Sequence, residues 1–188
     1  MTEILLFHHA HGLTQGVLDF AGALRDQGHT VHTPALYDGN QFTALHAGVA
    51  FAEQVGFGEI IGRGAAAAAA LPSELVYAGF SLGTLPAQAL TQNRPGALGA
   101  LLFHGGEPTE EFGQPWPPGV PLQMHIAEAD PWTELSQCQT LADQIAGAEL
   151  YVYPGSAHLF ADPGSDDYDS VSAALLMDRT LTFLERIS

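Results

Sequence analysis

The sequence contains no lysine, and its five basic residues, all arginines, stand against 21 acidic residues. The resulting net charge of −16 argues against binding to nucleic acid or to anionic membranes, because both are recognised through basic clusters. We expect such a chain to attract neutral or cationic ligands more readily than anionic ones.

Cysteine and long apolar runs are also scarce. The single cysteine, Cys138, cannot form an internal disulfide, so nothing favours an oxidising compartment. No apolar run approaches the roughly 18 residues of a membrane span. The first residues, Met1-Thr2-Glu3, lack the basic and apolar segments of a secretory signal. We therefore expect a cytoplasmic protein that is a monomer or a small homo-oligomer.

What the sequence does contain is typical of a globular fold: 46% apolar and 14% charged residues over 188 positions, enough for one domain spanning residues 1–188. Short apolar runs alternate with segments of helical periodicity, which predicts a mostly parallel sheet with helices on both faces, an α/β architecture. The predicted strands are 4–7, 30–36, 75–78, 98–103, 122–127 and 150–153. Helices are expected over 13–24, 133–145 and 171–184, with two more inside 44–70 that meet at 56–58.

The run Gly79-Phe80-Ser81-Leu82-Gly83 lies between a predicted strand and a predicted helix. Strand, Gly-x-Ser-x-Gly and helix in this order form the nucleophile elbow of α/β-hydrolases. Glycines are needed because a side chain two residues from the serine would collide with the neighbouring strand or helix. The motif also arises by chance, in which case Ser81 sits in an ordinary turn.

An elbow serine requires two partners in a fixed order along the chain, an acid and then a histidine. Asp130 and His158 follow two later predicted strands. A histidine activates the serine hydroxyl, and a carboxylate orients the histidine. Glu128 is a rival for the acid, but it lies where the turn has barely begun, so we prefer Asp130.

The remaining site residues are predicted from their loops. The oxyanion hole needs one amide from the residue after the serine, Leu82, and one from the loop after an early strand, for which we choose Ala10. The His104-Gly105-Gly106 run looks like an oxyanion loop but follows the serine in the chain, so we interpret it as a cavity wall. The candidates for substrate contact are His9, His11, Tyr37, His104 and Trp132. Trp116 and Phe112, on the long loop over 105–121, are candidates either for the cleft wall or for core packing.

Nine histidines, among them His8-His9-Ala10-His11, raise the question of a nickel, copper or zinc site. His8 and His9 are adjacent at a strand end and should point in opposite directions. No cysteine or carboxylate joins them at ligand spacing. We therefore predict no metal and no cofactor.

The chain resembles the dienelactone hydrolase family of small α/β-hydrolases over nearly its whole length. The matching segments are His11-Gly12-Leu13, Asp19-Phe20-Ala21, Gly28-His29-Thr30-Val31, Pro34-Ala35-Leu36-Tyr37, the elbow, Asp130 and Gly155-Ser156-Ala157-His158. The resemblance implies an α/β-hydrolase fold without a large lid domain and hydrolysis of esters or lactones.

Three features, at four positions, depart from the pattern that the resemblance implies. The best-known members carry a cysteine at the elbow, where this chain has Ser81. His9 stands in place of a glutamate that helps gate that cysteine, and His11 in place of a phenylalanine. Asp162 replaces an arginine that grips the carboxylate of the family's substrate, and an acid there would repel a carboxylate. We therefore expect a serine hydrolase that cleaves a small neutral ester or lactone through an acyl-enzyme.

Two alternatives stay open at this point. The same fold could capture a small molecule without turning it over, since fold does not guarantee activity. The same triad could also serve a thioesterase or a peptidase.

Overall fold

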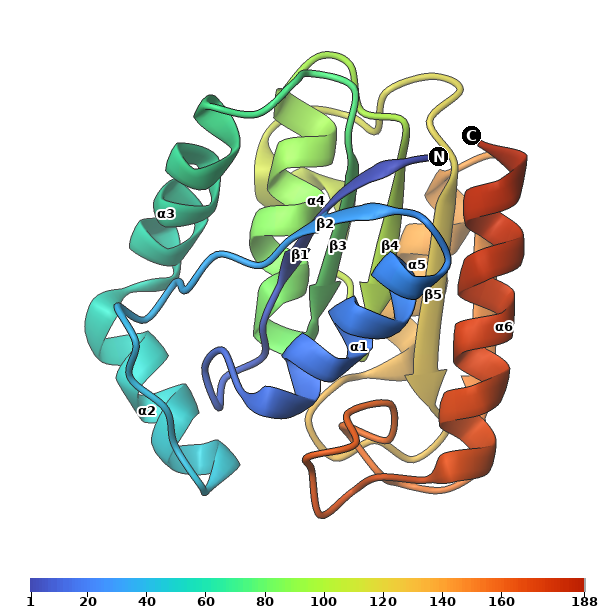
Figure 1. Cartoon of the computed structure of the whole chain (residues 1–188). Coiled ribbons are helices and arrows are strands. Elements are labelled where there is room, and N and C mark those ends of the chain that lie inside the picture. The colour runs from blue at the N-terminus through green and yellow to red at the C-terminus, as the bar shows by residue number, and fades with distance from the viewer. Residues whose placement is uncertain (188) are drawn as a thin grey trace.

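The computed structural model describes residues 1–187 and contains a six-stranded sheet, all of whose strands are parallel, in the order β2-β1-β3-β4-β5-β6. Helices alternate with the strands along the chain (Figure 1). The strands are β1 Glu3–Phe7, β2 Thr30–His32, β3 Val76–Phe80, β4 Gly99–Phe103, β5 Leu122–Ala127 and β6 Glu149–Tyr153. The α-helices are α1 Gln15–Asp26, α2 Leu45–Val55, α3 Phe57–Ala69, α4 Thr84–Asn93, α5 Leu135–Gln144 and α6 Ser170–Arg186.

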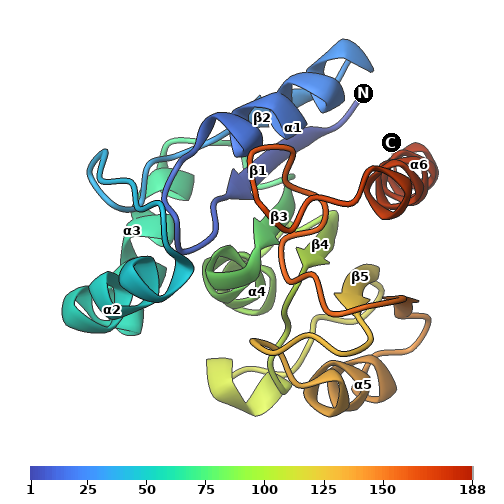
Figure 2. The same cartoon turned by 90° about the horizontal axis from the view of Figure 1, so that it is seen from below.

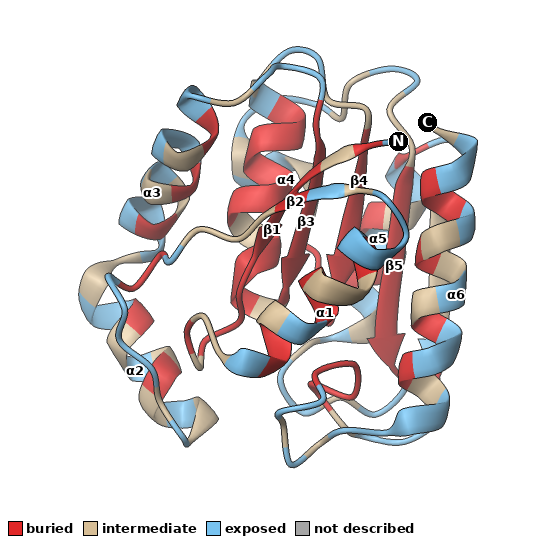
Figure 3. Cartoon of the chain, viewed as in Figure 1, coloured by how far each residue is buried: buried red, intermediate tan, exposed pale blue. Residues whose placement is uncertain are grey.

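Two hydrophobic clusters lie on the two faces of the sheet, because alternate side chains of each buried strand point in opposite directions. On β1, Ile4 and Leu6 pack into the cluster beneath α1 and α6, whereas Leu5 and Phe7 pack into the cluster beneath α2 to α5. Figure 2 shows α1 and α6 on one side of the sheet and α3, α4 and α5 on the other. The strands and the inward faces of the helices are buried, as Figure 3 shows.

The predicted parallel sheet with helices on both faces is confirmed, and most element boundaries agree with the sequence pattern. The helical region over 44–70 divides at Gly56, as expected, into α2 and α3. The strand predicted over 30–36 was too long, because β2 ends at His32 and the chain then leaves the sheet. The long loop over 105–121 contains a short 3₁₀ turn, Thr109–Phe112.

The carboxyl edge of the sheet, where the strands of Figure 1 end in arrowheads, is the edge where ligands bind in open parallel sheets. Across residues 1–187 no separate lid domain covers this edge. The described helices include none that is both long and apolar enough to cross a membrane.

Candidate active site

The turn after β3 holds Ser81 in a conformation that few side chains adopt, with φ of 48°. A short 3₁₀ turn, Ser81–Gly83, leads directly into α4. A Cβ atom on Gly79 would stand 2.1 Å from the carbonyl oxygen of Gly83, and one on Gly83 would stand 2.5 Å from that of Phe7. Both glycines are therefore required by close backbone approach, and the strained turn they permit raises Ser81 above the sheet edge.

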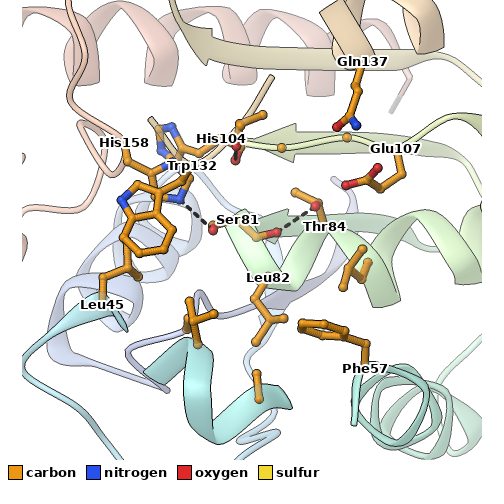
Figure 4. Close-up of a pocket in the computed structure, with 17 residues that line it drawn as sticks. Leu45, Phe57, Ser81, Leu82, Thr84, His104, Glu107, Trp132, Gln137 and His158 are labelled. Atoms are coloured by element: carbon orange, nitrogen blue, oxygen red, sulfur yellow. Dashed lines mark hydrogen bonds between the residues drawn. The ribbon is translucent and has the colours of Figure 1, made fainter. Parts of the chain in front are cut away.

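Ser81, His158 and Asp130 form a continuous hydrogen-bonded chain. The Oγ atom of Ser81 lies 2.7 Å from Nε2 of His158 (Figure 4), and Nδ1 of His158 lies 2.7 Å from Oδ2 of Asp130. The structure therefore brings together three residues that are separated by 49 and 28 positions in the sequence. This is the order and geometry of a nucleophile, a base and the acid that orients the base.

The carboxylate of Asp130 is enclosed, and its side chain has no exposed surface. Its second oxygen, Oδ1, accepts a hydrogen bond of 2.8 Å from the amide of Trp132, whose ring packs 6.3 Å from the ring of His158. Glu128, the rival acid, is exposed to solvent. Burial strengthens the hydrogen bond between Asp130 and the His158 imidazole, because water does not compete for the carboxylate.

Ala10 and Leu82 both line a cavity of about 230 Å³ that opens onto Ser81. Ala10 follows β1, the strand next to β3 in the sheet, so its loop lies beside the elbow. Gly48 of α2 packs on this loop so closely that a Cβ atom there would stand 1.9 Å from the carbonyl oxygen of Ala10. Helix α2 therefore packs against the loop whose Ala10 amide was chosen from the sequence as one half of the oxyanion hole.

His104 also lines this cavity, directly after β4 and with φ of 65°. Its ring is completely buried against Phe160, with ring centroids 4.6 Å apart. Neither ring nitrogen has a hydrogen-bond partner among residues 1–187. Burial and the nearby His158 lower the pKa of His104 well below its ordinary value, so the ring is neutral at physiological pH.

His9 and His11 do not line the cavity at Ser81. They border a second cavity of about 780 Å³ that shares Leu45 and Trp132 with the first. Trp132 thus stands between the two spaces, with 49% of its surface exposed. The sequence predicts that the two histidines contact substrate beside Ser81, but they line the neighbouring cavity instead.

The partner of His9 is Asp162, with Nε2 of the imidazole 2.6 Å from Oδ2 of the carboxylate, and both side chains are buried. Burial lowers the pKa of His9 despite this hydrogen bond. For Asp162, burial alone would raise the pKa, but hydrogen bonds from His9 and from the Gly164 amide outweigh it and lower the pKa. The pair is therefore a neutral imidazole whose Nε2–H donates a hydrogen bond to an ionised carboxylate.

Three aromatic residues considered from the sequence lie away from both cavities. Tyr37 is buried in the core, and its hydroxyl donates to the carbonyl oxygen of Gly48 at 3.1 Å. The sequence predicts Tyr37 as a substrate contact, and the structure does not place it at either cavity. Trp116 donates its indole N–H to Val120 within its own loop and, like Phe112, contributes to neither cavity wall.

Sequence reasoning missed much of the cavity wall beside Ser81. One side is apolar and comes from α2, α3 and α4, through Leu45, Val49, Ala52, Phe57 and Leu85. The other side is polar and carries Thr84, Glu107 and Gln137, which Figure 4 shows around the space next to Ser81. No motif marks these residues, because only the packing of separate helices and loops brings them together.

No group of three or more histidine, cysteine, aspartate or glutamate side chains in the described part of the chain is arranged to hold a metal ion. The buried thiol of Cys138 has its pKa raised to about 12 by burial, so it is neither a thiolate nucleophile nor a metal ligand at neutral pH.

The parallel sheet with a strained serine turn at its carboxyl edge defines the α/β-hydrolase fold, and comparison with solved structures agrees. A dienelactone hydrolase-like promiscuous phosphotriesterase from metagenomic libraries is 16% identical, with a TM-score of 0.74 over 100% of this chain and 87% of its own. A putative dienelactone hydrolase from Klebsiella pneumoniae is 19% identical, with a TM-score of 0.74 over 97% and 85%. A propionate-bound esterase from Thermogutta terrifontis is 16% identical, with a TM-score of 0.66 over 100% and 84%.

The model of the dienelactone hydrolase family matches residues 1–188, so the chain belongs to that family. This confirms the resemblance seen in the sequence, and family membership supports a hydrolase. No curated protein sequence matches the chain.

Proposed function

We propose that the protein is a serine hydrolase that cleaves a small ester or lactone bearing no negative charge. The observation that carries this proposal is the unbroken chain of short hydrogen bonds from Ser81 through His158 to Asp130. Membership of the dienelactone hydrolase family supports it.

In the first half of the reaction, the Oγ atom of Ser81 attacks the carbonyl carbon while its proton passes to Nε2 of His158. Asp130 accepts a hydrogen bond from Nδ1–H and stabilises the imidazolium. The amides of Ala10 and Leu82 donate to the oxyanion of the tetrahedral intermediate. Collapse of the intermediate breaks the bond to the leaving alcohol, which takes the proton from Nε2 and leaves an acyl-enzyme.

In the second half, water attacks the acyl carbon and His158 takes its proton. The bond to Ser81 then breaks, the proton returns to Oγ, and the carboxylic acid product dissociates. The same residues thus act twice, with His158 first as base and then as acid in each half.

The substrate preference follows from the charges around the site. No arginine lines either cavity in the described chain, and the sequence has no lysine. Asp162 lies at the edge of the second cavity as an ionised group. A carboxylate on the substrate would therefore meet repulsion and no compensating cation.

Labelling with a fluorophosphonate probe tests the proposal against a protein of the same fold that binds without turnover. The wild type should form a covalent adduct, and Ser81→Ala should not. Ser136→Ala, which removes an exposed hydroxyl on α5, is the matched control and should label like the wild type. A wild type that resists the probe while binding small esters would favour the binding protein instead.

A further inference from the structure

The catalytic cavity contains one carboxylate that the proposed mechanism does not use, that of Glu107. This residue follows His104-Gly105-Gly106 after β4, on the polar wall of the cavity. Figure 4 shows its side chain directed into the space between Thr84 and Gln137. Half-buried, the carboxylate makes no hydrogen bond or ion pair with any residue in the described chain.

Its backbone, in contrast, is firmly held. The amide of Glu107 donates to Oε1 of Gln88 at 3.1 Å, and Nε2 of Gln88 donates back to the carbonyl oxygen of Glu107 at 2.6 Å. Gln88 is fully buried on α4 and also donates to Gln92 at 3.0 Å. The helix that begins at the nucleophile elbow therefore fixes the backbone of Glu107 relative to Ser81.

A partly buried carboxylate without a partner is unfavourable, because it loses water without gaining a hydrogen bond or an opposite charge. Burial, together with the nearby Glu111, raises the pKa of Glu107. A positively charged ligand in the cavity would remove this penalty by pairing with the carboxylate. No side chain among residues 1–187 does so, and the arginines contact groups elsewhere, such as Glu59 and Asp38 for Arg63 and Glu149 for Arg186.

The surroundings favour the same kind of ligand. The adjoining second cavity is lined by Asp162, Asp166 and Asp167 and by no basic residue other than histidine. The half-exposed ring of Trp132 lies at the junction of the two cavities and offers an aromatic surface to a cation. The net charge of −16 draws cations toward the whole molecule.

Building on the proposed hydrolase function, we propose that Glu107 is a specificity-determining residue and that the substrate is an ester carrying an amine or quaternary ammonium group. The carboxylate of Glu107 pairs with this group while the ester carbonyl lies at Ser81. The apolar wall formed by Leu45, Val49 and Phe57 receives the hydrocarbon part of the substrate.

The test compares esters that differ in charge, with the cationic and neutral members of each series matched in shape. One series carries the group in the alcohol: choline butyrate, its neutral isostere 3,3-dimethylbutyl butyrate and an anionic 2-sulfoethyl ester. The other carries it in the acyl part of p-nitrophenyl esters: 4-(trimethylammonio)butyrate, 5,5-dimethylhexanoate and hemiglutarate. In at least one series, we expect kcat/KM for the cation to exceed that of the neutral isostere about tenfold, a modest value because the carboxylate is only half-buried.

Glu107→Gln should bring this ratio to about one in that series. Glu74→Gln removes the same charge from an exposed position outside both cavities and should leave the ratio at its wild-type value. Asp166→Asn tests the second cavity. If it removes the preference while Glu107→Gln retains it, the assignment to Glu107 is wrong.

The outcomes separate this inference from the proposed function. Hydrolysis of neutral esters without any preference for cations in either series would overturn the substrate class and leave the hydrolase intact. If no ester is hydrolysed, the hydrolase proposal fails, and calorimetry of choline binding to the Ser81→Ala protein still decides the role of Glu107. Binding that weakens at least about fivefold in the Ser81→Ala, Glu107→Gln double variant supports the role, and equal binding contradicts it.

Discussion

Buried neutral histidines make the stability of this protein sensitive to mild acid. Nε2 of His8 accepts a hydrogen bond of 3.0 Å from the amide of Leu36, and Nδ1 lies 2.8 Å from the carbonyl oxygen of His9, which only the neutral ring satisfies. His125 is equally buried, between the hydroxyl of Tyr153 at 2.7 Å and Oε1 of Gln123 at 2.9 Å. Protonation would therefore introduce a buried charge at either position.

The size of the effect follows from the pKa values. Burial lowers the pKa of His8 from 6.5 to about 4, and burial with a minor contribution from Arg179 lowers that of His125 from 6.5 to about 3. Below pH 6.5 these two histidines bind protons in the unfolded chain but stay neutral in the folded protein. The free energy of unfolding therefore falls as pH falls. Each histidine then lowers the free energy of unfolding by about 1.4 kcal/mol per pH unit. From pH 7 to pH 5 the two together lower it by about 4 kcal/mol.

This loss is a large fraction of the 5 to 15 kcal/mol that holds a typical domain together. His9 and His104, whose pKa values are also lowered by burial, change stability in the same direction. Carboxylates contribute little in this interval, because ordinary aspartate and glutamate side chains stay ionised above about pH 5.

Urea unfolding followed by circular dichroism at half-unit steps from pH 7.5 to pH 5 measures the effect. The slope of unfolding free energy against pH should be positive throughout and should decrease by about 1.4 kcal/mol per pH unit near pH 5 in His125→Gln. The exposed His46 provides the control, and His46→Gln should keep the wild-type slope. A wild-type stability that changes by less than about 1 kcal/mol between pH 7 and pH 5 would refute the reasoning.

Two substitutions test how neighbouring elements support the site. Gly48→Ala would place a methyl group 1.9 Å from the carbonyl oxygen of Ala10, so we expect the displaced loop to lower kcat at least about tenfold with a smaller change in KM. Steady-state kinetics with retained folding would check this, and wild-type kcat would contradict it. Asp162→Ala removes the buried acceptor of the His9 Nε2–H and should lower the unfolding free energy by about 2 kcal/mol at pH 7, measured in urea, because a buried donor is left unpaired. A loss below about 0.5 kcal/mol would show that the pair contributes little.

Much of the fold could be predicted because short apolar runs and helical periodicity report burial directly. The convergence of Ser81, His158 and Asp130 was predictable for a related reason, since residues that follow parallel strands meet at one edge of the sheet. Gly56 lies between two segments of helical periodicity, and it correctly predicted where α2 ends and α3 begins.

The remainder depends on contacts between distant segments. His9 pairs with Asp162 across 153 positions, and nothing near either residue signals the pair. Tyr37 follows the end of β2 at His32 and is buried against Gly48 of α2, a contact between separate segments that the local sequence does not signal. Glu107 belongs to a long loop whose position is set by the buried amide of Gln88, which no periodicity reveals.

The most direct test of the account is the kinetics of Ser81→Ala on p-nitrophenyl acetate beside the wild type, with matched folding verified by circular dichroism. The hydrogen-bonded chain from Ser81 to Asp130 predicts that kcat/KM falls by a factor of about 10³ or more, because the hydroxyl that forms the acyl-enzyme is gone. Activity within tenfold of the wild type would contradict the assignment of Ser81 as nucleophile.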